Sequence, residues 1–136
     1  MRQHVSNMVL DASALLAYLY EEPGADAVEH ALSFGSSISA VNWAEVLSKA
    51  ADIGIAPERL VSELRERGVL NNALKIFPLI AEDGLEIARL RPLTQNLGLS
   101  LGDRACLALG KRLKLPVMTA DRVWSAVPGM EIKLIR

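Results

Sequence analysis

Short apolar runs alternate along the chain with longer stretches in which apolar residues recur at helical spacing, and this pattern predicts strands alternating with helices. Gly and Pro residues lie between the stretches, where they end one element before the next begins. The predicted strands are residues 8–10, 36–39, 75–79, 116–119 and 132–135. The predicted helices are residues 12–20, about 25–32, about 41–53, about 57–67, 81–90 and 101–113.

This alternation indicates a mainly parallel sheet, because parallel neighbours need a crossover connection and the crossing helices then cover both faces. No internal repeat, low-complexity tract or linker divides the 136 residues. Just over half of them are apolar, which is enough for one sizeable core. We therefore expect a single α/β domain over residues 1–136, with helices on both faces of a central sheet.

Charge and composition exclude several classes of protein. The net charge is -1, so bulk electrostatic attraction cannot hold a nucleic acid, and any RNA-binding surface must be local. Cys106 is the single cysteine, and His4 and His30 lie far apart, which leaves few ligands for zinc. The sequence has neither a secretory start nor a long apolar run, so we expect a soluble cytoplasmic protein without a membrane anchor.

Acidic residues follow two of the predicted strands. Asp11 comes directly after the first strand, and Asp121 follows the strand that ends at Thr119. Because ligands of open parallel sheets bind beyond the carboxyl ends of the strands, these two carboxylates are expected at the ligand-binding edge. Glu45, early in the third helix, and Asp103, in the first turn of the sixth, can overhang the same edge.

Four carboxylates gathered within about 5 Å would repel one another by roughly 3 kcal/mol per pair, so a cation is expected to compensate them. Oxygen ligands without nearby sulfur or imidazole favour Mg²⁺ or Mn²⁺. Such a site suits hydrolysis of a phosphodiester by a metal-activated water. The chain contains no P-loop, no dinucleotide-binding fingerprint and no nucleophile elbow that would indicate another chemistry.

Each acid also has a purely structural interpretation. Asp11 could cap the helix that follows it, and Asp121 could be an ordinary turn residue. Asp103 lies three residues after Ser100, which is the spacing of a capping box, and Glu45 lies at the same spacing from a polar residue. Taken singly, none of the four acids distinguishes the two interpretations.

Four further polar residues are candidates for a supporting role around the acids. The hydroxyls of Ser13 and Thr119 could contact the first acid, although each also fits its helix or strand. Asn42 lies one helical turn before Glu45 and could orient a ligand or begin the helix. Arg104 could bind a phosphate, but an arginine beside an acid is more often solvated or ion-paired.

Four segments contain the acids together with distinctive neighbours. They are residues 9–13 (VLDAS), 40–45 (AVNWAE), 101–108 (LGDRACLA) and 119–122 (TADR). In their order and spacing these segments resemble the motifs of PIN domains, and in particular those of the VapC-type toxins of bacterial toxin–antitoxin modules. The resemblance covers nearly the whole chain.

The resemblance implies an endoribonuclease that depends on Mg²⁺ or Mn²⁺ and inhibits translation and growth. It also implies that Asp11, Glu45 and Asp103 are the main metal-binding acids, and that Asp121 acts directly or through water. Members of the family typically form homodimers, and a small antitoxin inserts its tail into the acidic groove. The homodimer and a VapB-like antitoxin are therefore expected partners.

Two other functions compete with the ribonuclease. A non-catalytic PIN-like module that binds RNA or protein would be expected to lack some of the acids, and none is missing. A phosphoacceptor or phosphatase domain would also gather acids at the strand ends. A phosphatase of the haloacid-dehalogenase type usually has an aspartate two residues after the first, where this chain has Ser13.

Overall fold

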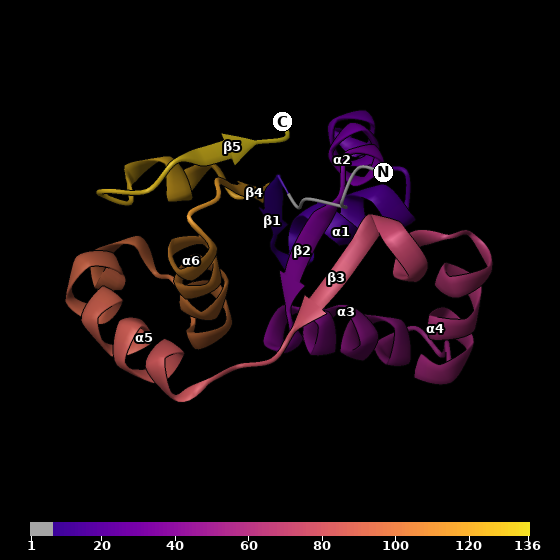
Figure 1. Ribbon diagram of the computed structural model, residues 1–136, viewed down its shortest axis with the longest axis horizontal. Coiled ribbons are helices and arrows are strands. Elements are labelled where there is room, and N and C mark those ends of the chain that lie inside the picture. Colours follow the sequence, from indigo (N-terminus) through magenta and orange to yellow (C-terminus); the bar gives the residue numbers. More distant parts are fainter. Residues whose placement is uncertain (1–6) are drawn as a thin grey trace, which may run out of the picture.

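The computed structural model describes residues 7–136, which form one five-stranded sheet with helices on both faces (Figure 1). All neighbouring strands of the sheet run parallel, in the order β3-β2-β1-β4-β5. The predicted α/β fold with a mainly parallel sheet is therefore confirmed. The strands are β1 (Met8–Leu10), β2 (Ser36–Ser39), β3 (Leu74–Phe77), β4 (Val117–Thr119) and β5 (Ile132–Leu134).

Six α-helices connect the strands, and each lies where the apolar periodicity predicts one. They are α1 (Ala12–Leu19), α2 (Ala25–Ser33), α3 (Ala40–Asp52), α4 (Pro57–Glu66), α5 (Ala81–Thr94) and α6 (Leu101–Leu113). Three short turns escape the periodicity because they are too brief to show it: a π-helical turn and two 3-10 turns, at Val69–Ala73, Gln95–Leu97 and Arg122–Ala126.

Two boundaries differ from the prediction for reasons that involve proline. The third strand ends at Phe77 instead of residue 79, since Pro78 has no N–H to donate to a strand ladder. Helix α5 continues past Pro92 to Thr94 instead of ending at residue 90. The Thr94 hydroxyl donates a hydrogen bond to the Leu90 carbonyl, which satisfies one acceptor in this last turn.

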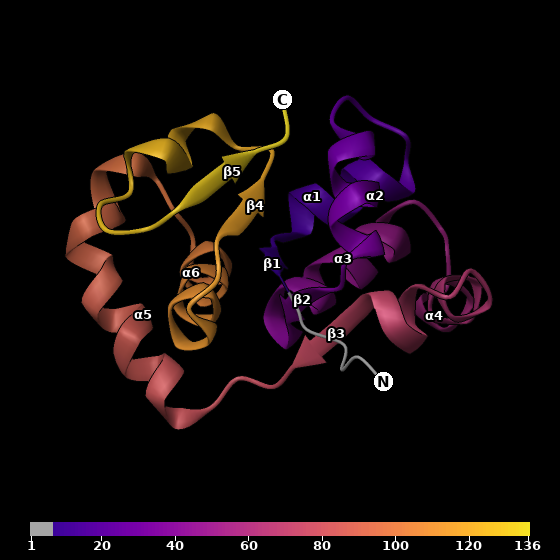
Figure 2. The same cartoon turned by 45° about the horizontal axis from the view of Figure 1, so that its top comes forward.

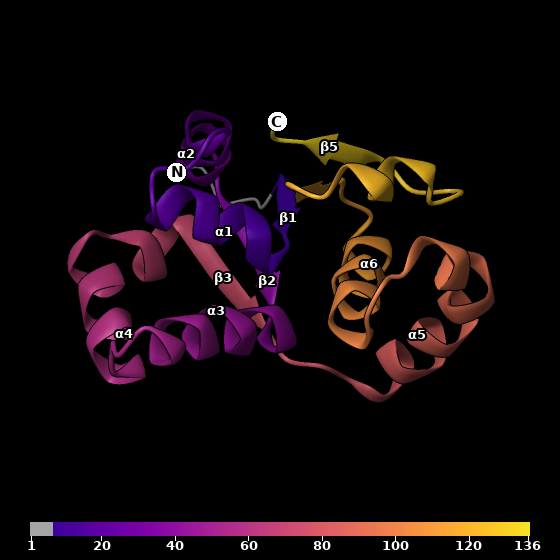
Figure 3. The same ribbon diagram turned by 180° about the vertical axis from the view of Figure 1, so that it is seen from behind.

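Successive residues of the central strands belong to different cores, as the two-residue period of a strand requires. Leu10 and Met118 pack with residues of α1 to α4, whereas Val9 and Val117 pack with residues of α5 and α6. Figures 1 and 3 show these two groups of helices on opposite sides of the sheet. Both faces are therefore covered, which explains why β2 is buried along its whole length.

The chain changes direction across the sheet between β1 and β4. From β1 it proceeds through β2 to β3 at one edge, and it then returns through α5 and α6 to β4 on the other side of β1 (Figure 2). Crevices at such switch points, beyond the carboxyl ends of the strands, are where ligands bind in open parallel sheets. Asp11 directly follows β1, so the fold places this residue at the switch point.

Helices α5 and α6 are joined by a partly buried ion pair. Arg112 donates two hydrogen bonds to Asp83, from Nε to Oδ1 at 3.0 Å and from Nη2 to Oδ2 at 3.1 Å. Asp83 also accepts a hydrogen bond from the backbone N–H of Ile80. The pair fixes the α5–α6 unit that covers one face of the sheet. No helix within residues 7–136 is both long enough and apolar enough to cross a membrane.

Gly110 marks the closest approach of α6 to the sheet. A Cβ at this residue would lie 2.5 Å from Val117 Cγ2, so we expect Gly110→Ala to lower the free energy of unfolding by about 1–3 kcal/mol. Gly84→Ala is the matched control, because a Cβ there meets nothing within 4 Å and alanine favours a helix by about 0.5–1 kcal/mol. Urea denaturation measures both changes. Equal effects of the two substitutions would show that the α6–β4 contact is not tight.

Candidate active site

The four acids selected from the sequence line one pocket. It has a volume of about 230 Å³, and its walls come from the residue after β1, from α1, α3 and α6, and from the segment after β4. The structure thus brings together carboxylates that are up to 110 positions apart in the chain. The residues that line the pocket are Asp11, Ala12, Ser13, Leu16, Glu45, Lys49, Asp103, Asp121 and Trp124.

Asp11 is the innermost of these acids, with only 4% of its surface exposed. It caps α1, since its Oδ1 accepts a hydrogen bond of 2.8 Å from the Ala14 N–H. The Ser13 hydroxyl donates to the same carboxylate, at 2.7 Å to Oδ1 and 2.9 Å to Oδ2, and the Thr119 hydroxyl donates to Oδ2 at 2.6 Å. The Asp11 side chain is therefore held from both β4 and α1.

Burial changes the acidity of Asp11. Loss of solvent raises its pKa from 3.8 to about 6, and the negative charge of Asp103 adds to the rise. The hydrogen bonds from Thr119, Ser13 and the Ala14 N–H act in the opposite direction, because they stabilise the ionised form. Its environment is thus unfavourable to a negative charge that has no cation beside it.

Glu45 is placed by Asn42 and by the absence of a side chain at Gly102. Asn42 Nδ2 donates to Glu45 Oε1 at 2.8 Å and to the Gly102 carbonyl at 3.0 Å, which joins α3 to α6. A Cβ on Gly102 would lie 2.7 Å from Glu45 Oε2. Glycine at position 102 therefore allows the Glu45 carboxylate to lie against the first turn of α6.

Asp103 and Asp121 are held by capping hydrogen bonds. Asp103 Oδ2 accepts from the Ser100 N–H at 2.9 Å, and the Ser100 hydroxyl accepts from the Asp103 N–H at 3.1 Å, which completes a capping box. Asp121 Oδ1 accepts from the Val123 N–H at 3.2 Å and begins a 3-10 turn. The structural interpretation of these acids is correct, and it coexists with their place in the pocket.

The capping or positioning bonds of Glu45, Asp103 and Asp121 each use only one oxygen of the carboxylate. Within residues 7–136 no protein donor reaches the second oxygen of three acids, and no ion pair includes any of the four. The unbonded oxygens are Glu45 Oε2, Asp103 Oδ1 and Asp121 Oδ2. The protein thus fixes the orientation of these carboxylates and leaves one acceptor of each for a ligand.

The donor chemistry of the pocket fits a hard divalent cation. All four acids offer oxygen, and the buried Oδ1 of Asn42 has no hydrogen-bond partner in the described part of the chain. Burial raises the pKa of the Cys106 thiol well above its usual range, and the negative charges of Asp11, Asp103 and Glu45 add to this rise. Among residues 7–136, no three acidic, His or Cys side chains lie close enough together to enclose a metal ion.

Three of the four candidate supporting residues lie beside the acids. Ser13 and Thr119 hold Asp11, and Asn42 holds Glu45. Arg104 does not line the pocket and is neither solvated nor ion-paired among the described residues, so the structure supports neither interpretation considered for it. Its side chain is buried and its Nη1 donates to the Ile87 carbonyl at 3.0 Å, so this arginine joins α6 to α5.

The sequence reasoning missed Lys49, which lines the pocket beside the carboxylates. The signal was available, because Lys49 lies four residues after Glu45 and therefore on the same face of α3. Trp124, which also lines the pocket, is 1% exposed and packs in the core against α6.

We expect Asp11→Asn to stabilise the metal-free protein at pH 7.5. A folded-state pKa of about 6 lies above 3.8, so the ionised side chain destabilises the fold fully above pH 6 and progressively less as the pH falls toward 4. This rise in pKa corresponds to a loss of folding free energy on the order of 3 kcal/mol, which Asp11→Asn removes. Asparagine can still cap α1. Urea denaturation at pH 7.5 and pH 4.5 measures the gain, which should be smaller at the lower pH.

Asp121→Asn is the control for this experiment, because Asp121 is exposed and its change should stay within about 0.5 kcal/mol at both pH values. An Asp11→Asn protein that is no more stable than the wild type at pH 7.5 would show that the Ser13 and Thr119 hydroxyls fully compensate the buried charge.

Comparison with solved structures finds the same fold in several toxin–antitoxin complexes. A toxin–antitoxin complex from Klebsiella pneumoniae is similar over 96% of this chain and 98% of its own, at 20% identity and a TM-score of 0.68. The DNA-bound VapBC of Salmonella typhimurium matches over 97% and 100%, at 15% identity and a TM-score of 0.72. FitAcB of Neisseria gonorrhoeae matches over 94% and 97%, at 19% identity and a TM-score of 0.69.

Comparison with curated proteins finds no significant sequence match. The family model of the PIN domain matches residues 8–130, a span that contains strands β1 to β4 and all four acids of the pocket. The chain therefore belongs to the PIN domain family.

Proposed function

We propose that this protein is an endoribonuclease that depends on Mg²⁺ or Mn²⁺ and acts as the VapC-type toxin of a toxin–antitoxin module. The observation that carries the proposal is the pocket at the switch point, where four carboxylates converge and three keep an oxygen free of protein donors. Membership of the PIN family and the toxin–antitoxin complexes among the similar folds support it.

In this proposal Asp11, Glu45 and Asp103 hold the metal ion, and Asp121 contributes directly or through water. A bound divalent ion supplies an activated water, neutralises phosphate oxygens and stabilises the leaving alkoxide. Ser13 and Thr119 fix the rotamer of Asp11, and Asn42 fixes that of Glu45. These contacts organise the carboxylates in advance, which reduces the cost of ordering them when substrate binds.

The proposal includes two protein partners. A short VapB-like antitoxin would place a basic side chain among the carboxylates, which lack an ion-pair partner within the described residues. A second copy of the chain is the other partner. Helix α5 leaves Leu85 and Leu93 more than half exposed, and apolar surface of this kind is typical of protein interfaces.

The direct test is cleavage of total cellular RNA by purified protein freed of antitoxin. We expect cleavage with Mg²⁺ or Mn²⁺, none with excess EDTA, and for Asp11→Asn no more than the wild type shows in EDTA. Circular dichroism and thermal unfolding confirm that the variant is folded. Sequencing the new RNA ends identifies the cleaved sites. Intact RNA after treatment with metal-loaded wild-type protein would refute the ribonuclease and favour a non-catalytic binding module.

Gly102→Ala tests whether the position of Glu45 matters for cleavage. The added Cβ would meet only the flexible end of Glu45, so stability should change little while the carboxylate moves. Because small displacements of catalytic groups are costly, we expect kcat/KM for RNA to fall by about 10- to 100-fold. Gly84→Ala, which meets nothing within 4 Å, should keep wild-type activity. Full activity of Gly102→Ala would show that Glu45 need not lie against α6.

A further inference from the structure

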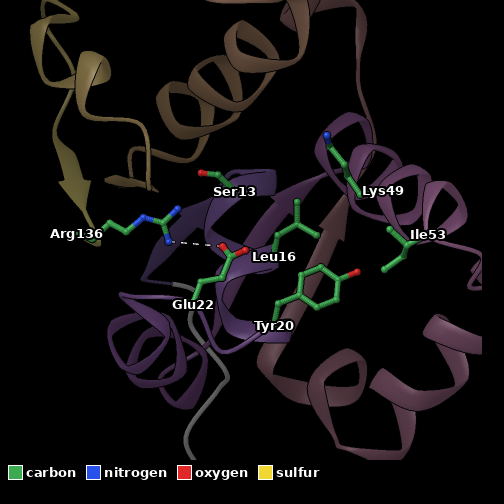
Figure 4. A pocket seen from close by; sticks show the side chains of 7 residues that line it. All are labelled: Ser13, Leu16, Tyr20, Glu22, Lys49, Ile53 and Arg136. Carbon is green, nitrogen blue, oxygen red and sulfur yellow. Dashed lines mark ion pairs between the residues drawn. The ribbon is translucent and has the colours of Figure 1, made fainter.

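A second cavity adjoins the acidic pocket. It has a volume of about 300 Å³, and three of the residues that line it, Ser13, Leu16 and Lys49, also line the acidic pocket. A ligand that enters one can therefore extend into the other. Figure 4 shows all seven lining residues: Ser13, Leu16, Tyr20, Glu22, Lys49, Ile53 and Arg136.

One side of this cavity is apolar and contains an accessible aromatic ring. Tyr20 at the end of α1 is 42% exposed and Ile53 after α3 is 62% exposed, and Figure 4 shows them on the same side of the cavity, next to Leu16. Exposed aromatic rings in grooves are the surfaces on which the bases of single-stranded nucleic acids stack.

The charges in the cavity leave one cation uncompensated. Glu22 pairs with Arg136 at 3.6 Å, and Arg136 Nη1 also donates to the Pro23 carbonyl at 2.8 Å. Lys49 makes no ion pair with any residue that the structure describes, although it lies one helical turn from Glu45. Its ammonium group is available to an anion at the junction of the two pockets.

We propose that this cavity binds one nucleotide of single-stranded RNA, next to the phosphate that the carboxylates act on. The base packs against Tyr20 and Ile53, and Lys49 binds the phosphate that joins this nucleotide to the rest of the strand. The inference rests on the proposed ribonuclease function and adds to it the residues that hold the nucleotide beside the cleaved bond.

A nucleotide fits this pair of pockets better than an apolar peptide side chain does. It combines a flat base with an anion a few bonds away, which matches an apolar wall and a lysine that faces the acidic pocket. A peptide side chain could fill the apolar part and would leave Lys49 without a partner. Protein binding is therefore the alternative that the experiment must separate from RNA binding.

The test measures binding rather than cleavage, so it is independent of the proposed activity. The probe is a fluorescein-labelled single-stranded RNA of 12 mixed-sequence nucleotides, and the protein carries Asp11→Asn so that the probe stays intact. Fluorescence anisotropy with Mg²⁺ gives the Kd. We expect Tyr20→Ala to raise Kd by about 5- to 100-fold and Tyr20→Phe, which keeps the ring, to change it little.

Phe34→Ala is the matched control, since Phe34 is an exposed aromatic residue outside the cavity and its loss should leave Kd unchanged. Lys49→Ala should lower the slope of log Kd against log salt concentration by about 0.7, the loss expected for one phosphate contact with a single strand. Lys75→Ala, outside the cavity, should not change the slope.

The outcomes separate this inference from the proposed function. A weaker Tyr20→Ala complex supports the nucleotide site even where the wild-type protein cleaves no RNA, in which case only the ribonuclease proposal fails. Failure of the Asp11→Asn protein to bind the probe overturns the inference, as does equal affinity of Tyr20→Ala and Phe34→Ala. RNA binding unaffected by Tyr20→Ala, with loss of antitoxin binding, would assign the cavity to the protein partner instead.

Discussion

The structure depends on one unfavourable interaction, the burial of the Asp11 carboxylate at the point where the sheet reverses its strand order. The protein surrounds this charge with three hydrogen-bond donors and still leaves its pKa near 6, because neutral donors do not replace lost solvent. A second negative charge, on Asp103, adds to the cost. A bound cation would offset both the burial of the Asp11 charge and its repulsion by Asp103. The electrostatic cost of this part of the fold and the proposed metal-dependent chemistry therefore depend on the same buried carboxylate.

Caps and ligands share the carboxylates instead of competing for them. A capping bond occupies one oxygen and restricts the rotamer of the side chain, which costs a marginally stable domain little and gains it a helix terminus. For Asp103 and Asp121 the other oxygen stays free of protein donors in the described structure. The hydrogen bond that caps a helix thereby also orients a carboxylate toward the pocket. For this reason, the spacing in the sequence could not distinguish a capping acid from a ligand-binding acid.

The sequence predicted every strand, every α-helix and the four acids of the pocket, because apolar periodicity and strand-end position are local signals. It failed where the deciding contact is distant in the chain. Arg104 follows an acid in sequence, yet its guanidinium points into the α5–α6 contact, which only packing reveals. Lys49 and Tyr20 belong to the pockets through the approach of α1 to α3, and the role of Gly102 requires knowing that Glu45 lies against it.

The hydrogen bond between Thr119 and Asp11 joins residues that are 108 positions apart, and β1 pairs with β4 over a similar distance. A parallel pairing of such long range forms slowly, since the loop between the strands must first be ordered. The pocket consequently lacks the side formed by Asp121 and Trp124 until this segment has been synthesised and β4 has paired with β1. A chain in which β4 has not yet paired with β1 therefore lacks a complete site, and the proposed ribonuclease activity can arise only after this pairing.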